Sequence, residues 1–260
     1  DKYNVNYGTG LTRRADTQRN DPDQSKPVIQ YTKDGQKVAE YPSIKEAVRQ
    51  TGIKKDTISQ ILTAATVTGE DILATYKAEI ESAILVDIEG NKVGDLNIED
   101  CEVYGTSDLK KQIAAEQKSL PVYIFKNGYT VVPCYGAGLW GPIWGYIALD
   151  ADMNTVKGIV LDHSGETPGL GAEITTPKHQ AMYPGKTVYE GDAIVGVTLK
   201  KGGADKSNPH EVDAITGGTK TSDGVTAMIS DCLNYYKPYF DAARAAATAT
   251  VEAESNTLNE

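Results

Sequence analysis

Cysteine and histidine are scarce in this sequence, which excludes several kinds of site. The 260 residues include Cys101, Cys134, Cys232, His163, His179 and His210 as their complete set of these two types. An odd number of scattered cysteines indicates neither a disulfide framework nor a Cys-x-x-Cys metal site. The histidines show no metal-ligand spacing, and no Ser-His-Asp or Cys-His arrangement is visible. We therefore assign no catalytic and no metal-binding residue.

Long apolar runs are also missing, since no window approaches 18 consecutive apolar residues, so no segment of this sequence is expected to span a membrane. The formal net charge of −10 argues against a nucleic-acid surface spread over the whole molecule, although it leaves a local basic patch open. The length allows one large domain or two small ones. Because the chain begins with Asp1 rather than Met, we expect a fragment or a processed product whose membrane anchor lies upstream and is missing here.

The N-terminal part of the chain changes character near Pro27. Residues 1–26 are polar and predict an arm without regular structure. Residues 27–63 predict a small basic module: a hairpin of 28–31 and 37–41, then helices 44–50 and about 56–62 that form a helix-turn-helix-like pair. Residues 26–55 carry seven Lys or Arg against three Asp or Glu. The segment resembles the short DNA-binding modules appended to homing endonucleases, and a helical appendage with a solvated charged face is the alternative interpretation.

Residues 64–240 predict the main domain, of α+β class with an antiparallel or mixed sheet, because strands outnumber long crossover helices. The expected helices are 70–82, 106–117 and 223 to about 236. The expected strand pairs are 83–88 with 92–96, 121–125 with 129–132 across a two-residue turn at Asn127-Gly128, and 144–149 with 156–161, plus a strand at 192–199. Residues 241–260 predict a flexible tail. The whole is thus an α+β domain with a small N-terminal ββαα appendage.

The segment Asp213–Ser222 gathers hydroxyls, two adjacent glycines and a lysine directly before a helical pattern. Glycines let the backbone turn sharply and approach a ligand closely. Ser222 is predicted to cap the helix, whose N-terminus favours an anion. Val225, Met228, Ile229, Cys232, Leu233 and Tyr236 form one buried stripe on that helix. A capped turn before a core helix remains the alternative interpretation of the segment.

Two further glycine-rich stretches and one basic strand end are candidates for ligand contacts. Gly136–Tyr146 combines glycines with aromatic rings on which a flat ligand could stack, or it forms a hairpin corner with two core tryptophans. His163–Glu173 offers Glu166 and Thr167 at a constrained turn, or is a plain turn. Lys200 and Lys201 either neutralise a phosphate or lie at a solvated strand end.

Three motifs in this order carry a family resemblance: Gly138-Leu-Trp-Gly with Trp144-Gly-Tyr146, Glu166-Thr-Pro-Gly-Leu-Gly171, and Asp213-x-x-Thr-Gly-Gly-Thr219-x-Thr221. Over roughly residues 55–238 the chain resembles the covalent-FMN-binding domain family, above all the flavin-binding C subunit of the Na⁺-translocating NADH:quinone reductase and, less closely, the G subunit of the Rnf complex. The N-terminal basic module departs from that family.

The resemblance implies FMN joined by a phosphoester bond to Thr219, attached by a flavin transferase that uses FAD and Mg²⁺. The other implied cofactor-binding residues are Asp213, Thr216, Gly217, Gly218, Thr221, Glu166, Thr167, Leu170, Gly171, Trp140 and Lys201. Gly218 replaces the commoner alanine and Thr216 the commoner serine, and both substitutions keep the turn small. A tethered flavin cannot dissociate when its redox state changes, which suits electron transfer.

The resemblance also implies a setting: one component of a membrane-bound reductase complex in the bacterial inner membrane, with this domain on the extracytoplasmic side. Its partners would be the other components of that complex and the transferase, and no nucleic acid is expected apart from what residues 27–63 leave open. Two alternatives stand beside this prediction. The chain could be a non-enzymatic module that binds nucleic acid or protein through residues 27–63, or a domain that binds FMN without the ester.

Overall fold

The computed structural model describes residues 4–6, 28–31, 37–41 and 55–257, and the chain divides into two units, 1–54 and 55–260. In the first unit β1 (Asn4–Asn6), β2 (Val28–Tyr31) and β3 (Lys37–Tyr41) form an antiparallel sheet in that order. The predicted hairpin is confirmed, whereas part of the expected polar arm pairs with β2 as a strand. The turn expected before β3 and the helix expected at 44–50 lie outside the described residues.

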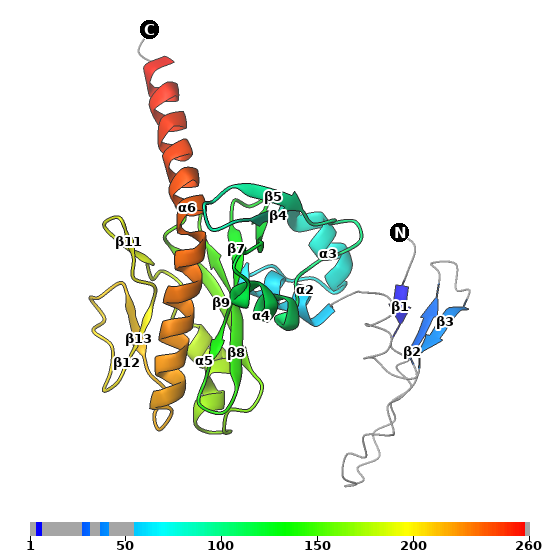
Figure 1. The fold of residues 1–260 in the computed structure, drawn as a ribbon, viewed down its shortest axis with the longest axis horizontal. Coiled ribbons are helices and arrows are strands. Elements are labelled where there is room, and N and C mark those ends of the chain that lie inside the picture. Colours follow the sequence, from blue (N-terminus) through cyan, green and yellow to red (C-terminus); the bar gives the residue numbers. More distant parts are fainter. Residues whose placement is uncertain (1–3, 7–27, 32–36, 42–54, 258–260) are drawn as a thin grey trace. The chain divides into compact units, whose positions relative to one another are not determined.

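The second unit is built on a six-stranded antiparallel sheet in the order β5-β4-β6-β7-β8-β9 (Figure 1). Its strands are β4 (Ile80–Val86), β5 (Lys92–Asp95), β6 (Leu120–Phe125), β7 (Thr130–Ala137), β8 (Pro142–Leu149) and β9 (Val156–His163). Two small pairs accompany it, antiparallel β10 (Tyr189–Glu190) with β11 (Ala193–Ile194) and parallel β12 (Thr198–Lys200) with β13 (Glu211–Asp213). The predicted α+β class is confirmed.

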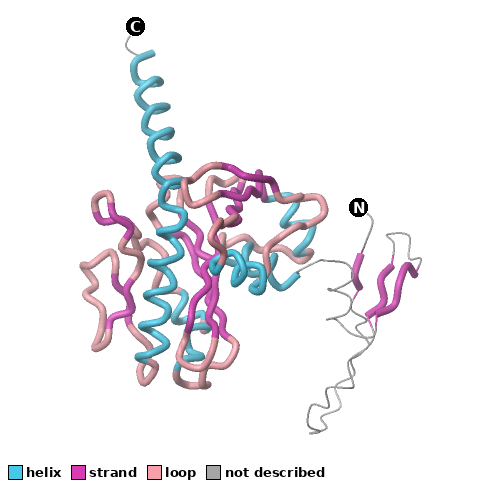
Figure 2. Tube along the Cα trace, in the orientation of Figure 1, coloured by secondary structure: helices cyan, strands magenta, loops and turns pink. Residues whose placement is uncertain are grey.

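Both faces of the large sheet bury apolar side chains, because successive side chains of a strand point to opposite faces; the edge strand β5 is the exception and is mostly exposed. On β8, Tyr146 and Ala148 belong to the core on one face, while Ile147 and Leu149 belong to the core on the other. The first face is covered by α2 (Lys55–Ala64) and α3 (Ile72–Glu79), and the second by α6 (Thr219–Thr257), as Figure 2 shows. The sheet is therefore the middle layer of three.

Helix α2 is part of this second unit, although the sequence predicts it as the last element of the basic module at 27–63. Its side chains Ile58, Ile61 and Leu62 are buried in the core with β8. The helix lies directly on β9, since a β-carbon at Gly158 would stand 2.2 Å from the carbonyl oxygen of Ala64. The boundary between the units therefore falls at 54/55 rather than at 63/64.

Helices α3 and α4 (Thr106–Ala114) end earlier than the sequence predicts. Asp71 caps α3 by accepting hydrogen bonds from the N–H groups of Leu73 and Ala74, and the helix stops at Glu79 because the next residues pair with β6. In α4 the ammonium group of Lys118 donates to two main-chain carbonyl groups at the C-terminal end, which ends the helix three residues before Gln117. Strand pairing and this capping override the helical pattern.

Two strand predictions also need correction. The β6–β7 connection is a three-residue loop, because Phe125 N donates to Tyr129 O and Gly128 has φ +88°, the left-handed conformation that such loops need. The strand expected at 192–199 is interrupted at Gly196, whose φ is +69°. At that point the backbone approaches Ser230 on α6 so closely that an added β-carbon would lie 3.2 Å from its Cα. The continuous strand pattern therefore becomes β11 and β12.

Helix α6 runs for 39 residues along the sheet and beyond it (Figure 1). The predicted stripe is confirmed, since its six side chains are buried, and Phe240 extends it by one turn. The helix begins at Thr219 rather than at Asp223 and continues to Thr257, where the sequence predicts a flexible tail. No helix within the described residues is both long and apolar enough to cross a bilayer.

A short helix, α5 (Pro177–Gln180), places His179 in the interior, where it is 3% exposed. Its Nε2 lies 3.0 Å from the Tyr183 hydroxyl, and Nδ1 has no hydrogen-bond partner among the described residues. Burial lowers the pKa of His179 to about 4, because the charged imidazolium would lose its hydration.

This buried histidine makes stability depend on pH. Its folded pKa lies below the unfolded value, so its contribution is complete above pH 6.5 and is lost as the pH falls through about 4. We expect the free energy of unfolding to drop by about 3 kcal/mol across that window. Urea unfolding of the wild type and of His179→Phe checks this, since the variant should lack that part of the slope. An identical slope in both proteins would contradict the prediction.

Candidate functional site

The connection between β7 and β8 is a tight hairpin tip of four residues, Gly138–Gly141. Gly138 N donates to Gly141 O over 2.8 Å, which leaves Leu139 and Trp140 at the end of the hairpin. Both side chains are exposed, Leu139 by 51% and Trp140 by 67%. Trp144, further along on β8, is half-buried. Neither tryptophan is a core residue, so the alternative of a corner built on two core tryptophans is wrong.

The loop after β9 holds the second motif and is constrained by its own backbone. Leu170 N donates to Thr167 O, and Gly169 between them has φ +76°, so Pro168 and Gly169 form a type II turn. Glu166 N donates to the Nδ1 of His163 over 3.1 Å, which fixes the start of the loop. The loop then enters a 3₁₀ helix at Gly171, and Leu170 is left 42% exposed.

The third motif forms a second type II turn directly before α6. Gly218 N donates to Ile215 O, and Gly217 has φ +74°, the conformation that the turn requires at this position. Thr219 is the first residue of the helix and is half-buried, while Thr216 precedes Gly217 in the turn. Since the first N–H groups of a helix have no intrahelical acceptor, the hydroxyl of Thr219 lies at a site that favours an anion.

Ser222 does not cap the helix, because α6 has already begun when the chain reaches it. Its hydroxyl instead accepts a hydrogen bond from Ile215 N over 3.0 Å and so closes the turn on itself. Ser222 N donates to Gly218 O as the first hydrogen bond of the helix. The serine thus holds the glycine turn in place from inside the helix, a role that the capping pattern did not reveal.

Glu166 joins the three motifs. This carboxylate is 4% exposed and accepts hydrogen bonds from Trp140 N over 2.9 Å and from the Thr221 hydroxyl over 2.5 Å. Glycines make room for it, because a β-carbon at Gly138 would lie 2.4 Å from one carboxylate oxygen and one at Gly171 would lie 2.4 Å from the other. The hairpin tip, the loop after β9 and the start of α6 therefore meet at one buried side chain.

The surface around Thr219 combines an anion-favouring helix end with exposed apolar groups. The side chains of Leu139, Trp140 and Leu170 are three of the five large exposed hydrophobic side chains in the described part of the chain. Leu170 touches the turn before Thr219, since a β-carbon at Gly217 would lie 2.7 Å from its Cδ2. A phosphate at the helix end and a flat apolar ring on these side chains would match this surface.

Some of the predicted site residues do not take part in this cluster. The carboxylate of Asp213 accepts a hydrogen bond from Ala204 N over 2.7 Å, so it secures the β12–β13 connection. Lys201 is exposed in the turn after β12, and Thr167 is exposed in the loop after β9. The list of site residues predicted from the sequence does not include Leu139 or His163. The His-x-x-Glu spacing was the available signal for His163, whose Nδ1 accepts a hydrogen bond from Glu166 N.

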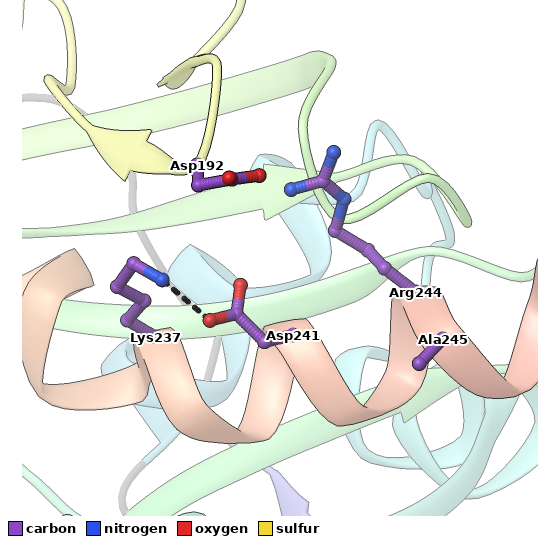
Figure 3. Close-up of a pocket in the computed structure, with 5 residues that line it drawn as sticks. All are labelled: Asp192, Lys237, Asp241, Arg244 and Ala245. Atoms are coloured by element: carbon purple, nitrogen blue, oxygen red, sulfur yellow. Dashed lines mark hydrogen bonds and ion pairs between the residues drawn. The ribbon is translucent and has the colours of Figure 1, made fainter.

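A cavity of about 310 Å³ lies elsewhere, roughly 27 Å further along α6 at 1.5 Å per residue (Figure 3). Its lining residues are Asp192, Lys237, Asp241, Arg244 and Ala245. Several polar groups here already bind one another: Lys237 pairs with Asp241 over 2.5 Å, the Tyr189 hydroxyl donates to the same carboxylate over 2.8 Å, and the Arg244 guanidinium lies 4.2 Å from the Tyr189 ring centroid. We therefore interpret this cluster as a brace between α6 and β10, not as the functional site.

The fold and the glycine loops around Thr219 define a class of protein. Residues 138–234 match the FMN-binding domain family, and residues 26–62 match the NUMOD1 domain family. The first match contains the hairpin tip, the loop after β9 and the start of α6. The second ends within α2, whose apolar face is buried in the second unit. The class that the matches indicate is thus a protein with an FMN-binding domain, and the segment before that domain is similar to NUMOD1 domains.

Individual relatives narrow the class. The C subunit of the Na⁺-translocating NADH-quinone reductase from Haemophilus ducreyi is 35% identical over 187 residues, 65% of this chain and 72% of the relative. The same protein from Pasteurella multocida is 47% identical over 109 residues, 40% of this chain and 42% of the relative. The crystal structure of the C subunit from Parabacteroides distasonis superposes with a TM-score of 0.66 at 31% identity, covering 76% of this chain and 97% of that one.

The chain belongs to the family of the C subunit of the Na⁺-translocating NADH-quinone reductase. It spans less than half the length of several curated relatives that it matches.

Proposed function

We propose that this chain is an electron-transfer subunit of a membrane-bound Na⁺-translocating NADH:quinone oxidoreductase and carries FMN on Thr219 through a phosphoester bond. The observation that supports the attachment is the position of Thr219. It follows two glycines, begins a long helix, and is half-buried at the helix end. A phosphodiester retains one negative charge, which the helix N-terminus stabilises.

The residues around Thr219 fit both the phosphate and the ring system of FMN. The turn at Gly217-Gly218 packs closely against its neighbours, because an added β-carbon would lie 2.7 Å from Leu170 Cδ2 at Gly217 and 2.9 Å from Ile215 Cγ2 at Gly218. Leu139, Trp140 and Leu170 offer apolar surface to a ring system. When bound, FMN supplies the group that accepts and donates electrons. The protein holds and orients it and contributes no acid–base residue.

The proposed setting follows from the family. Attachment would need a flavin transferase that uses FAD and Mg²⁺, and electron transfer would need the other subunits of the complex. We place the domain on the extracytoplasmic side of the bacterial inner membrane. Asp213, Thr216 and Lys201 belong to this proposal as residues of the recognised motif or of the phosphate surroundings, although their side chains do not meet at Glu166.

The test is the intact mass of the protein produced together with such a transferase. We expect a gain equal to one FMN less one water, and a yellow colour that persists after denaturation and gel filtration in denaturant. Protein produced without the transferase serves as the control and should show the unmodified mass. Flavin that is released on denaturation would show non-covalent binding, and the proposed ester would then be wrong.

A further inference from the structure

The proposed attachment raises the question of which hydroxyl is used, because three threonines lie within six residues. Thr216 lies in the turn, while Thr219 and Thr221 lie in the first turn of α6. Residues two apart on a helix point in directions about 200° apart, so Thr219 and Thr221 cannot present their hydroxyls to the same place. The structure distinguishes these two by their partners.

Thr221 is 1% exposed, and its hydroxyl donates to Glu166, a hydrogen bond between residues 55 positions apart in the sequence. With the residues that the structure describes, Glu166 forms no ion pair, so its two oxygens depend on Thr221 and on Trp140 N. A buried carboxylate is costly unless it is hydrogen-bonded, and the positive end of a helix lowers that cost. Glu166 thus satisfies both conditions at the start of α6.

The glycines around the hydrogen bond between Thr221 and Glu166 show how closely the neighbouring backbone packs against it. A β-carbon at Gly171 would lie 2.4 Å from both the Glu166 carboxylate and the Thr221 hydroxyl, and one at Gly224 would lie 2.4 Å from Ala137 O beside the hairpin tip. The first two turns of α6 are therefore held against the loop after β9 and the hairpin tip. Any movement of Thr221 would move Thr219 with it, because both belong to the same helical turn.

We propose that Glu166 is a positioning residue that determines the site of flavin attachment: by holding the Thr221 hydroxyl inside, it fixes the helical turn so that the Thr219 hydroxyl is presented outward to the flavin transferase. This inference rests on the proposed function. Thr221 then acts through Glu166 and does not contact the cofactor. The specificity of the attachment comes from a contact between two motifs that are distant in sequence.

The experiment measures the fraction of folded protein that carries flavin after production with the transferase. Glu166→Gln places an amide group where a carboxylate accepts two hydrogen bonds, and Thr221→Val removes the donor while keeping the shape. We expect each to lower the modified fraction about tenfold, the factor that corresponds to losing a hydrogen bond to a charged group. Thr221→Ser should restore it. The double variant should be no worse than either single one, because both changes remove the same contact.

Glu173→Gln is the matched control, because Glu173 lies just after the same loop and accepts from Gly169 N without reaching Thr221. It should be modified like the wild type. Normal modification of Glu166→Gln and Thr221→Val would overturn the inference while leaving the proposed function intact. A fall in modification that only follows loss of folded protein, seen by near-UV circular dichroism, would overturn it as well. An unmodified wild type would instead refute the proposed function.

Discussion

Replacing Thr219 by valine is expected to leave the protein without covalently attached flavin. Valine has the shape of threonine but no hydroxyl, so the phosphoester has no acceptor while the helix start keeps its packing. The turn before it depends on Gly217 and Ser222, which the substitution does not touch. Intact mass after production with a flavin transferase should show the unmodified protein, against a nearly complete adduct in the wild type.

Thr219→Ser is the matched control for this substitution, because serine returns the hydroxyl at the same atom position. It should recover measurable attachment, and peptide mapping should place the flavin on residue 219. An adduct that persists in Thr219→Val, or that maps to Thr216 or Thr221 in the wild type, would show that another hydroxyl is used.

Replacing Phe240 by alanine is expected to cost about 3–5 kcal/mol of unfolding free energy, the range for removing a buried aromatic side chain. Phe240 is fully buried and stacks on Tyr236, with ring centroids 5.8 Å apart. The side chain lies one helical turn beyond the stripe that the sequence indicates. Urea unfolding monitored by circular dichroism measures the loss.

Asp231→Ala gives the comparison for this core substitution, since Asp231 is exposed on the same helix. It should change the unfolding free energy by no more than about 0.5 kcal/mol. If Phe240→Ala were equally mild, the C-terminal part of α6 would not be packed on the sheet. Both variants keep the residues around Thr219, so they test the fold separately from the site.

Part of the site was predictable, because the conformation of its glycine turn depends on neighbouring residues in the sequence. Adjacent glycines before a helical stripe indicate a tight turn at a helix end, and Gly217 does adopt a positive φ there. The first residue of the helix was not predictable. Asp-x-x-Thr-Gly-Gly-Thr-Lys-Thr-Ser contains several residues that could cap a helix, and only the tertiary contacts of each side chain decide where the helix begins. Ser222 was predicted to cap the helix, but it lies inside the helix and its hydroxyl accepts a hydrogen bond from Ile215 N.

The same limit explains the other corrections. The chain at 192–199 has a strand pattern, but Gly196 lies against α6 and interrupts it. The motif predicts that Asp213 contacts the cofactor, yet its carboxylate accepts a hydrogen bond from the main-chain N–H of Ala204. Helix α2 reads as part of the basic module, although its apolar side chains complete the core of the second unit. In each case a distant partner decides what the local pattern leaves open.

The sequence alone determined the α+β class, three of the five strand pairs of the large sheet (β4–β5, β6–β7 and β8–β9), the buried stripe of α6 and the three glycine-rich motifs. These features depend on periodicity and on residue types that fix the backbone. Only the tertiary structure decided that the motifs meet at Glu166, that Thr221 is turned inward and that Thr219 begins the helix. Those facts depend on contacts between residues far apart in the chain, and no local pattern contains them.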